Sequence, residues 1–113
     1  MSNIYSDLQT YFGYKSFRGK QEEIIQRVLE KKHTIVIMPT GMGKSLCYQI
    51  PALSFSGLTV VISPLIALMQ DQVQSLRKKG IEATFINSSL NKEERNKRYK
   101  ELEEKKYKLL YVT

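Results

Sequence analysis

The sequence predicts an α/β fold in which helices flank a parallel β-sheet. Short runs rich in β-branched and aromatic residues recur along the chain, at 33–38, 58–63, 83–87 and 107–113. The first two lack polar alternation, which is typical of strands buried on both faces of a parallel sheet. Segments with helical spacing lie between the runs, and such alternation favours βαβ units.

Two amphipathic helices are expected before the first strand. Residues 3–12 place Ile4, Leu8 and Phe12 at helical spacing, and residues 19–32 do the same with Ile24, Ile25, Val28 and Leu29. A third helix is expected at 44–55, kinked at Pro51 because proline lacks a backbone donor.

The second half of the chain carries clear helix boundary signals. A helix is expected at 64–80, with Pro64 at its first position and Gly80 as its C-terminal cap. Its apolar face comprises Leu65, Leu68, Met69, Val73 and Leu76. Asn91 and Glu94 form a predicted capping box that opens a highly charged helix before the last strand.

Composition limits the function classes. The 113 residues suit one domain, with 42% apolar and 26% charged residues. A membrane-spanning run and a secretory leader are not recognised, so a cytosolic, non-membrane protein is expected. The single cysteine and single histidine form no metal cluster. The net charge of +7 favours polyanionic partners, although the tract at 91–106 is typical of a solvated helix face.

The stretch MPTGMGKS at 38–45 resembles a phosphate-binding loop, although Met38 stands where the general pattern has its first glycine. It lies between a predicted strand and a predicted helix, where backbone amides and the helix dipole attract an anion. Gly41 and Gly43 would let the backbone approach phosphates, Lys44 would neutralise them, and Ser45 would bind Mg²⁺. The alternative is a plain glycine turn, and Cys47 behind it is interpreted as a core residue.

Three blocks in order carry a family likeness: FGYKSFRGKQEEII, MPTGMGKSLCYQIPAL and VISPLIALMQDQV. Together they resemble the first motor domain of RecQ-type DNA helicases of superfamily 2, from about Leu8 to Thr113. The resemblance implies a RecA-like P-loop NTPase domain that uses ATP and Mg²⁺. It further implies 3′-to-5′ DNA unwinding in recombination and repair. PTGMGKS is similar to the helicase form of the loop, in which the first glycine is not required.

The resemblance also implies the residues of an ATP site. Lys44 and Ser45 are the implied catalytic residues, and Ser45 is the implied Mg²⁺ ligand. The implied nucleotide-binding residues are Tyr14, Arg18, Gln21, Thr40, Gly41, Met42, Gly43, Lys44 and Ser45. A glutamine side chain pairs with the N6 amino group and N7 of adenine, and guanine offers acceptors at both places. ATP is therefore expected to be preferred over GTP.

The third block resembles a segment that contacts the backbone of DNA, which makes Ser63 a candidate DNA-binding residue. Asn87, Ser88 and Thr113 are weaker candidates by the same resemblance. The basic run at 77–79 is interpreted as structural, because cations in the last turn of a helix offset its dipole.

Residues 1–113 are interpreted as part of a helicase ATP-binding domain, without the acidic DEAH-type motif and without the second motor domain. The expected partners are ATP, single-stranded or duplex DNA, and the missing C-terminal part of the same motor. We expect the chain to bind nucleotide without unwinding DNA and to leave sheet edges unpaired. Two alternatives remain open: a non-catalytic nucleic-acid-binding module with a vestigial loop, and a different P-loop enzyme such as a small-molecule kinase.

Overall fold

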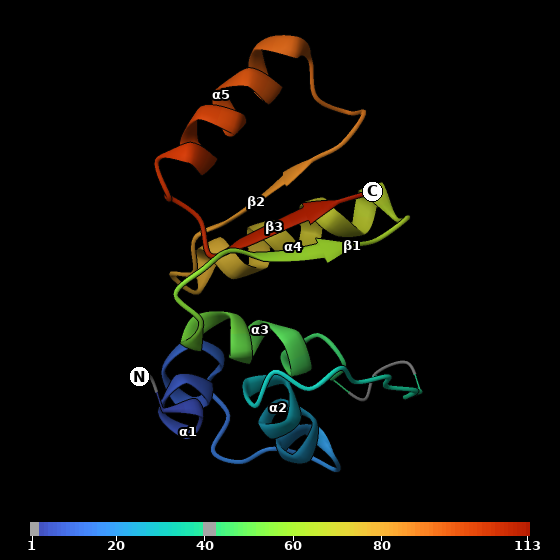
Figure 1. Cartoon of the computed structure of the whole chain (residues 1–113), viewed down its shortest axis with the longest axis vertical. Helices are drawn as coiled ribbons and strands as arrows, with labels where there is room; N and C mark the ends of the chain where they lie inside the picture. The colour runs from blue at the N-terminus through green and yellow to red at the C-terminus, as the bar shows by residue number, and fades with distance from the viewer. Residues whose placement is uncertain (1–2, 40–42) are drawn as a thin grey trace. The chain divides into compact units, whose positions relative to one another are not determined.

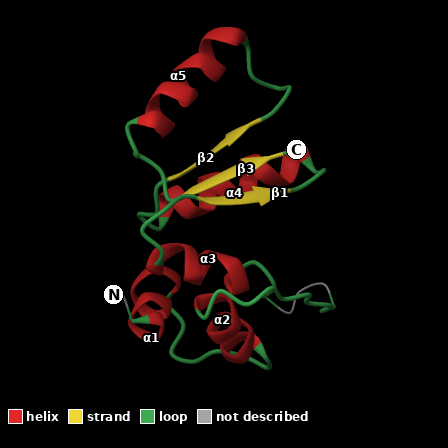
Figure 2. Cartoon of the chain, viewed as in Figure 1, coloured by secondary structure: helices red, strands yellow, loops and turns green. Residues whose placement is uncertain are grey.

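A computed structural model describes residues 3–39 and 43–113 of the chain (Figure 1). The chain divides into two compact units, residues 1–56 and 57–113. The first unit is helical and the second contains a small parallel sheet with two helices (Figure 2). The predicted α/β class is confirmed, and the predicted helices are found within a few residues of their expected bounds.

The first unit is built from α1 (Ile4–Asp7), the π-helical turn η1 (Leu8–Phe12), α2 (Gln21–Leu29) and α3 (Leu46–Ser54). The side chain of Asn3 caps α1 by accepting hydrogen bonds from the amides of Tyr5 and Ser6. The helices bury a shared apolar cluster of Ile4, Leu8, Ile25, Leu46 and Ile50. Burial of this cluster is what stabilises the short helices, which would be marginal alone.

The second unit contains β1 (Thr59–Ile62), α4 (Ile66–Lys78), β2 (Ala83–Ile86), α5 (Lys92–Glu103) and β3 (Leu109–Val112). The strands are parallel in the order β1-β3-β2, so β3 lies at the centre. Ile62, Val112 and Ile86 are register partners at the last position of each strand. The carboxyl ends of all three strands therefore meet at one edge of the sheet.

Local signals in the second unit are confirmed. The Asn91 side chain accepts a hydrogen bond from the Glu94 amide at 2.8 Å, and the Glu94 side chain accepts one from the Asn91 amide at 3.0 Å. This is the predicted capping box at the start of α5. Gly80 adopts a φ of +86° just past α4, a left-handed conformation that ends helices and favours glycine.

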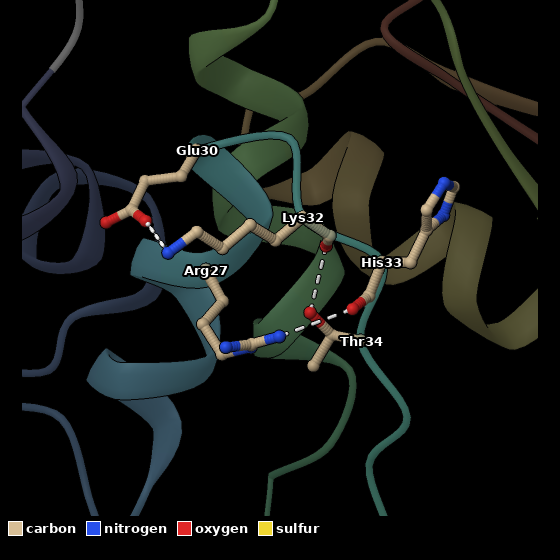
Figure 3. Close-up of polar contacts among 5 residues, drawn as sticks. All are labelled: Arg27, Glu30, Lys32, His33 and Thr34. Carbon is tan, nitrogen blue, oxygen red and sulfur yellow. Dashed lines mark hydrogen bonds and ion pairs between the residues drawn. The ribbon is translucent and has the colours of Figure 1, made fainter.

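The predicted strand at 33–38 is wrong. Residues 32–39 have no regular secondary structure, and Ile35 and Ile37 are 93% and 94% exposed. Arg27 of α2 donates to the His33 carbonyl, which ties the start of this segment to the helix, and the Thr34 hydroxyl donates to the Lys32 carbonyl within the segment (Figure 3). A strand exists through hydrogen bonds to a neighbour, and the described sheet has three strands that do not include this segment.

Two further expectations need correction around β1. The strand was expected to be buried on both faces, but Val60 and Ile62 are 52% and 79% exposed. Pro64 is not the first residue of α4, because Leu65 is still extended and donates its N–H to the Ser63 hydroxyl. This local turn delays the helix to Ile66.

The predicted apolar face of α4 is only partly buried. Met69, Val73 and Leu76 are each 1% exposed, so they form the face that packs in the second unit. Leu65 precedes the helix and is 58% exposed, and Leu68 is 45% exposed. Helical spacing therefore identified the core positions but overestimated the width of the buried stripe.

The two edges of the sheet differ. Ala83 and Phe85 turn their carbonyls away from β3, and these accept hydrogen bonds from Arg77 and Arg98. Side-chain donors on outward carbonyls block pairing with another strand. At the opposite edge, the outward-facing positions are Val60 and Ile62 of β1, whose side chains are exposed. Side chains thus block the β2 edge, whereas β1 carries exposed apolar side chains.

Candidate functional site

Gly43, Lys44 and Ser45 lie immediately before α3. Gly43 has a φ of +75°, a left-handed conformation that glycine adopts without strain. Ser45 is the N-cap of α3, and its side chain makes no capping hydrogen bond. The other predicted loop residues, Thr40, Gly41 and Met42, lie outside the described residues.

The chemistry of this loop end fits a phosphate group. The Lys44 and Ser45 carbonyls accept hydrogen bonds from the Cys47 and Gln49 amides, respectively, whereas the amides of Lys44, Ser45 and Leu46 have no acceptor among residues 3–39 and 43–113. Lys44 is exposed, so its ammonium group is accessible. Free amides and a cation at a helix N-terminus favour an anion. A hydroxyl that is not used for capping fits a Mg²⁺ ligand, so the residues present fit both proposed groups.

Arg18 and Gln21 lie beside this loop end, although the sequence separates them from it by more than twenty residues. Gln21 is 2% exposed, its Oε1 accepts from the Arg18 amide at 2.8 Å, and its Nε2 donates to the Gly43 carbonyl at 3.2 Å. The Arg18 Nη2 lies 3.9 Å from the point where a Cβ on Gly43 would be. Three of the predicted ATP-site residues are thus brought together in the first unit.

Tyr14 is also a predicted ATP-site residue, but among the described residues no contact of its side chain with Arg18, Gln21 or Gly43 is found. Its side chain is 56% exposed, and its backbone amide donates to the Leu8 carbonyl just after η1. An exposed aromatic ring retains the area needed for stacking on a base. Its role remains a prediction.

The candidate DNA-binding residues lie after the carboxyl ends of the strands in the second unit. Ser63 follows β1, Asn87 and Ser88 follow β2, and Thr113 follows β3, so the parallel register brings them to one edge. Ligands of open α/β sheets characteristically bind at this edge. Ser88 and Thr113 are exposed there.

The Asn87 side chain is engaged inside the second unit. It is 5% exposed, its Nδ2 contacts the Met69 sulfur at 3.5 Å, and its Oδ1 accepts from the amide and hydroxyl of Ser89. These contacts shape the turn after β2. The Asn87 side chain therefore holds Ser89 in this turn, and its polar atoms are already engaged there.

Sequence reasoning missed how polar side chains hold distant backbone groups. The bond between Gln21 and Gly43 spans two separate motifs, and no spacing rule predicts it. Arg77 and Arg98 hold carbonyls of β2, and with Tyr107 they line a cavity of about 350 Å³ beneath α5. The run at 77–79 was interpreted as structural, and the contact of Arg77 with the Ala83 carbonyl agrees with that interpretation.

Cys47 is 7% exposed in α3, and burial raises the pKa of its thiol. A thiol with a raised pKa keeps its proton in the folded chain after the unfolded chain has lost its own. The contribution of the Cys47 thiol to the free energy of unfolding is therefore fully present below the pKa of the thiol in the unfolded chain, about 8.5. It falls as pH rises above that value, by at most about 1.4 kcal/mol per pH unit. The urea concentration at the unfolding midpoint, measured at pH 7.5 and 9.5, should fall more for the wild type than for Cys47→Ala. An equal pH dependence in both proteins would contradict the prediction.

A search of the described residues for long apolar helices found none able to span a bilayer.

Residues 18–113 match the family model of DEAD/DEAH box helicases. The chain belongs to this family of helicases. Within it, the chain is 54% identical over 107 residues to the ATP-dependent DNA helicase RecQ of Bacillus subtilis, covering 94% of the chain and 18% of the relative. It is 55% identical over 108 residues to RecQ of Haemophilus influenzae, covering 96% of the chain and 17% of the relative. The resemblance to RecQ-type helicases is confirmed.

Among solved structures, a hypothetical ATP-dependent RNA helicase from Sulfolobus tokodaii matches with a TM-score of 0.78 and 20% identity, covering 100% of the chain and 34% of that structure. This match supports the fold. The chain spans less than a fifth of the length of the two RecQ relatives.

Proposed function

We propose that this chain forms the ATP-binding portion of a RecQ-type, 3′-to-5′ DNA helicase that acts in recombination and repair in the cytosol. The observation that carries the proposal is the grouping of Arg18, Gln21 and Gly43 beside the start of α3, where a cation and backbone amides without an acceptor in the described part of the chain are found. The similarity to RecQ helicases supports it across almost the whole chain.

Each residue has a distinct role in this proposal. Gln21 recognises adenine, Arg18 and Tyr14 hold the ring by cation–π contact and stacking, and Lys44 neutralises the β- and γ-phosphates. Ser45 would hold Mg²⁺, which would supply charge neutralisation for the phosphates. Thr40, Gly41 and Met42 are the remaining proposed nucleotide-binding residues, and they lie outside the described residues.

We further propose that these residues bind ATP without rapid turnover. Positioning of the attacking water and an arginine finger account for much of phosphoryl-transfer catalysis, the finger alone for roughly 10³ to 10⁵ in rate. The acidic residues after Asp71 are all glutamates, and apart from Glu82 they lie between 93 and 104, in or next to α5. The DEAH-type motif that the family uses is not among these 113 residues.

Competition between nucleotides tests the base recognition. A fluorescent ATP analogue bound to the wild-type chain is expected to be displaced by ATP at a concentration at least about tenfold lower than by GTP, since a bidentate hydrogen-bonding pair discriminates by roughly 1–3 kcal/mol. Equal displacement by both nucleotides would show that Gln21 does not read the base.

A nucleic-acid-binding module without nucleotide recognition is the second candidate, favoured by the net charge of +7 and by exposed Ser88 and Thr113 at one sheet edge. Binding of labelled single-stranded DNA would then weaken steeply with salt. DNA binding together with no detectable binding of the ATP analogue would favour this candidate over the first.

A further inference from the structure

Gln21 makes two hydrogen bonds of different kinds from one buried amide. Its oxygen accepts from the Arg18 amide within its own turn, and its nitrogen donates to the Gly43 carbonyl in the proposed phosphate loop. A Cβ on Gly43 would lie 2.3 Å from that nitrogen, closer than any real contact allows. The left-handed φ of Gly43 and the absence of its side chain are therefore both needed for this contact.

The contact determines which way the next peptide group faces. In a trans peptide, the carbonyl and the N–H point in opposite directions, and the described residues contain no cis peptide bond. With the Gly43 carbonyl held toward Gln21, the Lys44 N–H points away from it. That N–H is one of the amides that find no acceptor among the described residues and that fit an anion.

We infer that Gln21 is a positioning residue for the phosphate loop as well as a base-recognition residue. It orients the peptide between Gly43 and Lys44 so that the Lys44 amide faces the phosphates before the nucleotide arrives. The inference rests on the proposed function, because it concerns the same ATP site.

The hydrogen-bonding capacity of the amide permits both roles at once. A glutamine side chain has two N–H donors and two acceptor lone pairs. The two bonds found here use one donor and one lone pair. Within residues 3–39 and 43–113, one donor and one lone pair are left over, which are the partners that N7 and the N6 amino group of adenine require. Because Gln21 is only 2% exposed, the base must displace a covering group to reach it.

Inorganic triphosphate separates the two roles, because it has phosphates but no base. Calorimetric titration with triphosphate and Mg²⁺ is expected to show about 3- to 10-fold weaker binding for Gln21→Met and Gln21→Ala than for wild type, the effect of one neutral hydrogen bond. Gln26→Ala is the matched control: it makes the same chemical change at an exposed glutamine of α2 that belongs to no proposed site, so triphosphate binding should equal that of the wild type.

The possible outcomes distinguish a failure of this inference from a failure of the proposed ATP site. If the Gln21 variants bind triphosphate as well as wild type and lose only ATP affinity, Gln21 reads the base alone and the inference is wrong. If the wild type binds neither ligand, the proposed nucleotide site is wrong, and the inference with it. Gln21→Met keeps the length and bulk of the side chain, and thermal unfolding measured in parallel confirms that the variants compared are folded at the titration temperature.

Discussion

Replacing Lys44 with alanine is expected to weaken binding of an ATP analogue by about 10- to 100-fold, because a hydrogen bond from a charged donor contributes roughly 1.5–3 kcal/mol. Lys44 is exposed at the start of α3, beside amides with no acceptor among the described residues. Removing the ammonium group leaves those amides but takes away the cation that is proposed to neutralise the phosphates. Fluorescence anisotropy of a labelled ATP analogue measures the change.

Lys92→Ala is the matched control for that experiment. Lys92 is an exposed lysine at the first position of α5 and belongs to no proposed site, so its loss changes the net charge equally and leaves the loop residues unchanged. The affinity of Lys92→Ala for the analogue should equal that of the wild type within about twofold, because solvent-exposed charges are screened by salt. Equal weakening by Lys44→Ala and Lys92→Ala would mean that the chain attracts nucleotide through its overall charge.

Truncating Ile25 to alanine is expected to lower the free energy of unfolding by about 2–5 kcal/mol, the usual cost of removing a large buried aliphatic side chain. Ile25 is fully buried in the cluster shared by α2, α3 and the N-terminal helix. The cavity it leaves costs packing contacts as well as the transfer energy of the lost methylenes. Urea unfolding followed by circular dichroism measures the loss.

Ile37→Ala is the matched control for stability, since it makes the same chemical change at a side chain that is 94% exposed. Its expected effect lies within about 0.5 kcal/mol of zero, as for most exposed substitutions. A loss as large as that of Ile25→Ala would show that residues 33–38 are buried after all, as their composition predicts. The pair thus tests the correction to the predicted first strand.

Local patterns predicted the helices well because their causes are local. Asn91 and Glu94 are three residues apart, and each side chain accepts a hydrogen bond from the backbone amide of the other. The start of α5 could therefore be predicted from the local sequence without any tertiary contact. Gly80 ends α4 for a similarly local reason, its left-handed φ. The third helix was expected at 44–55 and begins two residues later, at Leu46, so that Lys44 and Ser45 directly precede α3.

Strands were harder to predict because a strand depends on a partner from elsewhere in the chain. Residues 33–38 have the composition of a buried strand, yet the described sheet pairs β1, β3 and β2 without them. The same dependence explains β1, where Val60 and Ile62 are apolar but face outward. The composition of a segment shows whether its side chains are apolar enough to be buried. Whether they are buried depends on pairing with a neighbouring strand and on what packs against the resulting sheet.

The amino-acid sequence is enough to infer the residue types of the candidate ATP site, the order of its motifs and the helix that follows the loop. Glycine, lysine and serine at this spacing are characteristic of a phosphate-binding loop. The hydrogen bond from Gln21 to the Gly43 carbonyl cannot be inferred in this way. It joins groups that only folding of the first unit brings within 3.2 Å, and its geometry depends on the backbone angle of Gly43 as much as on the identity of Gln21.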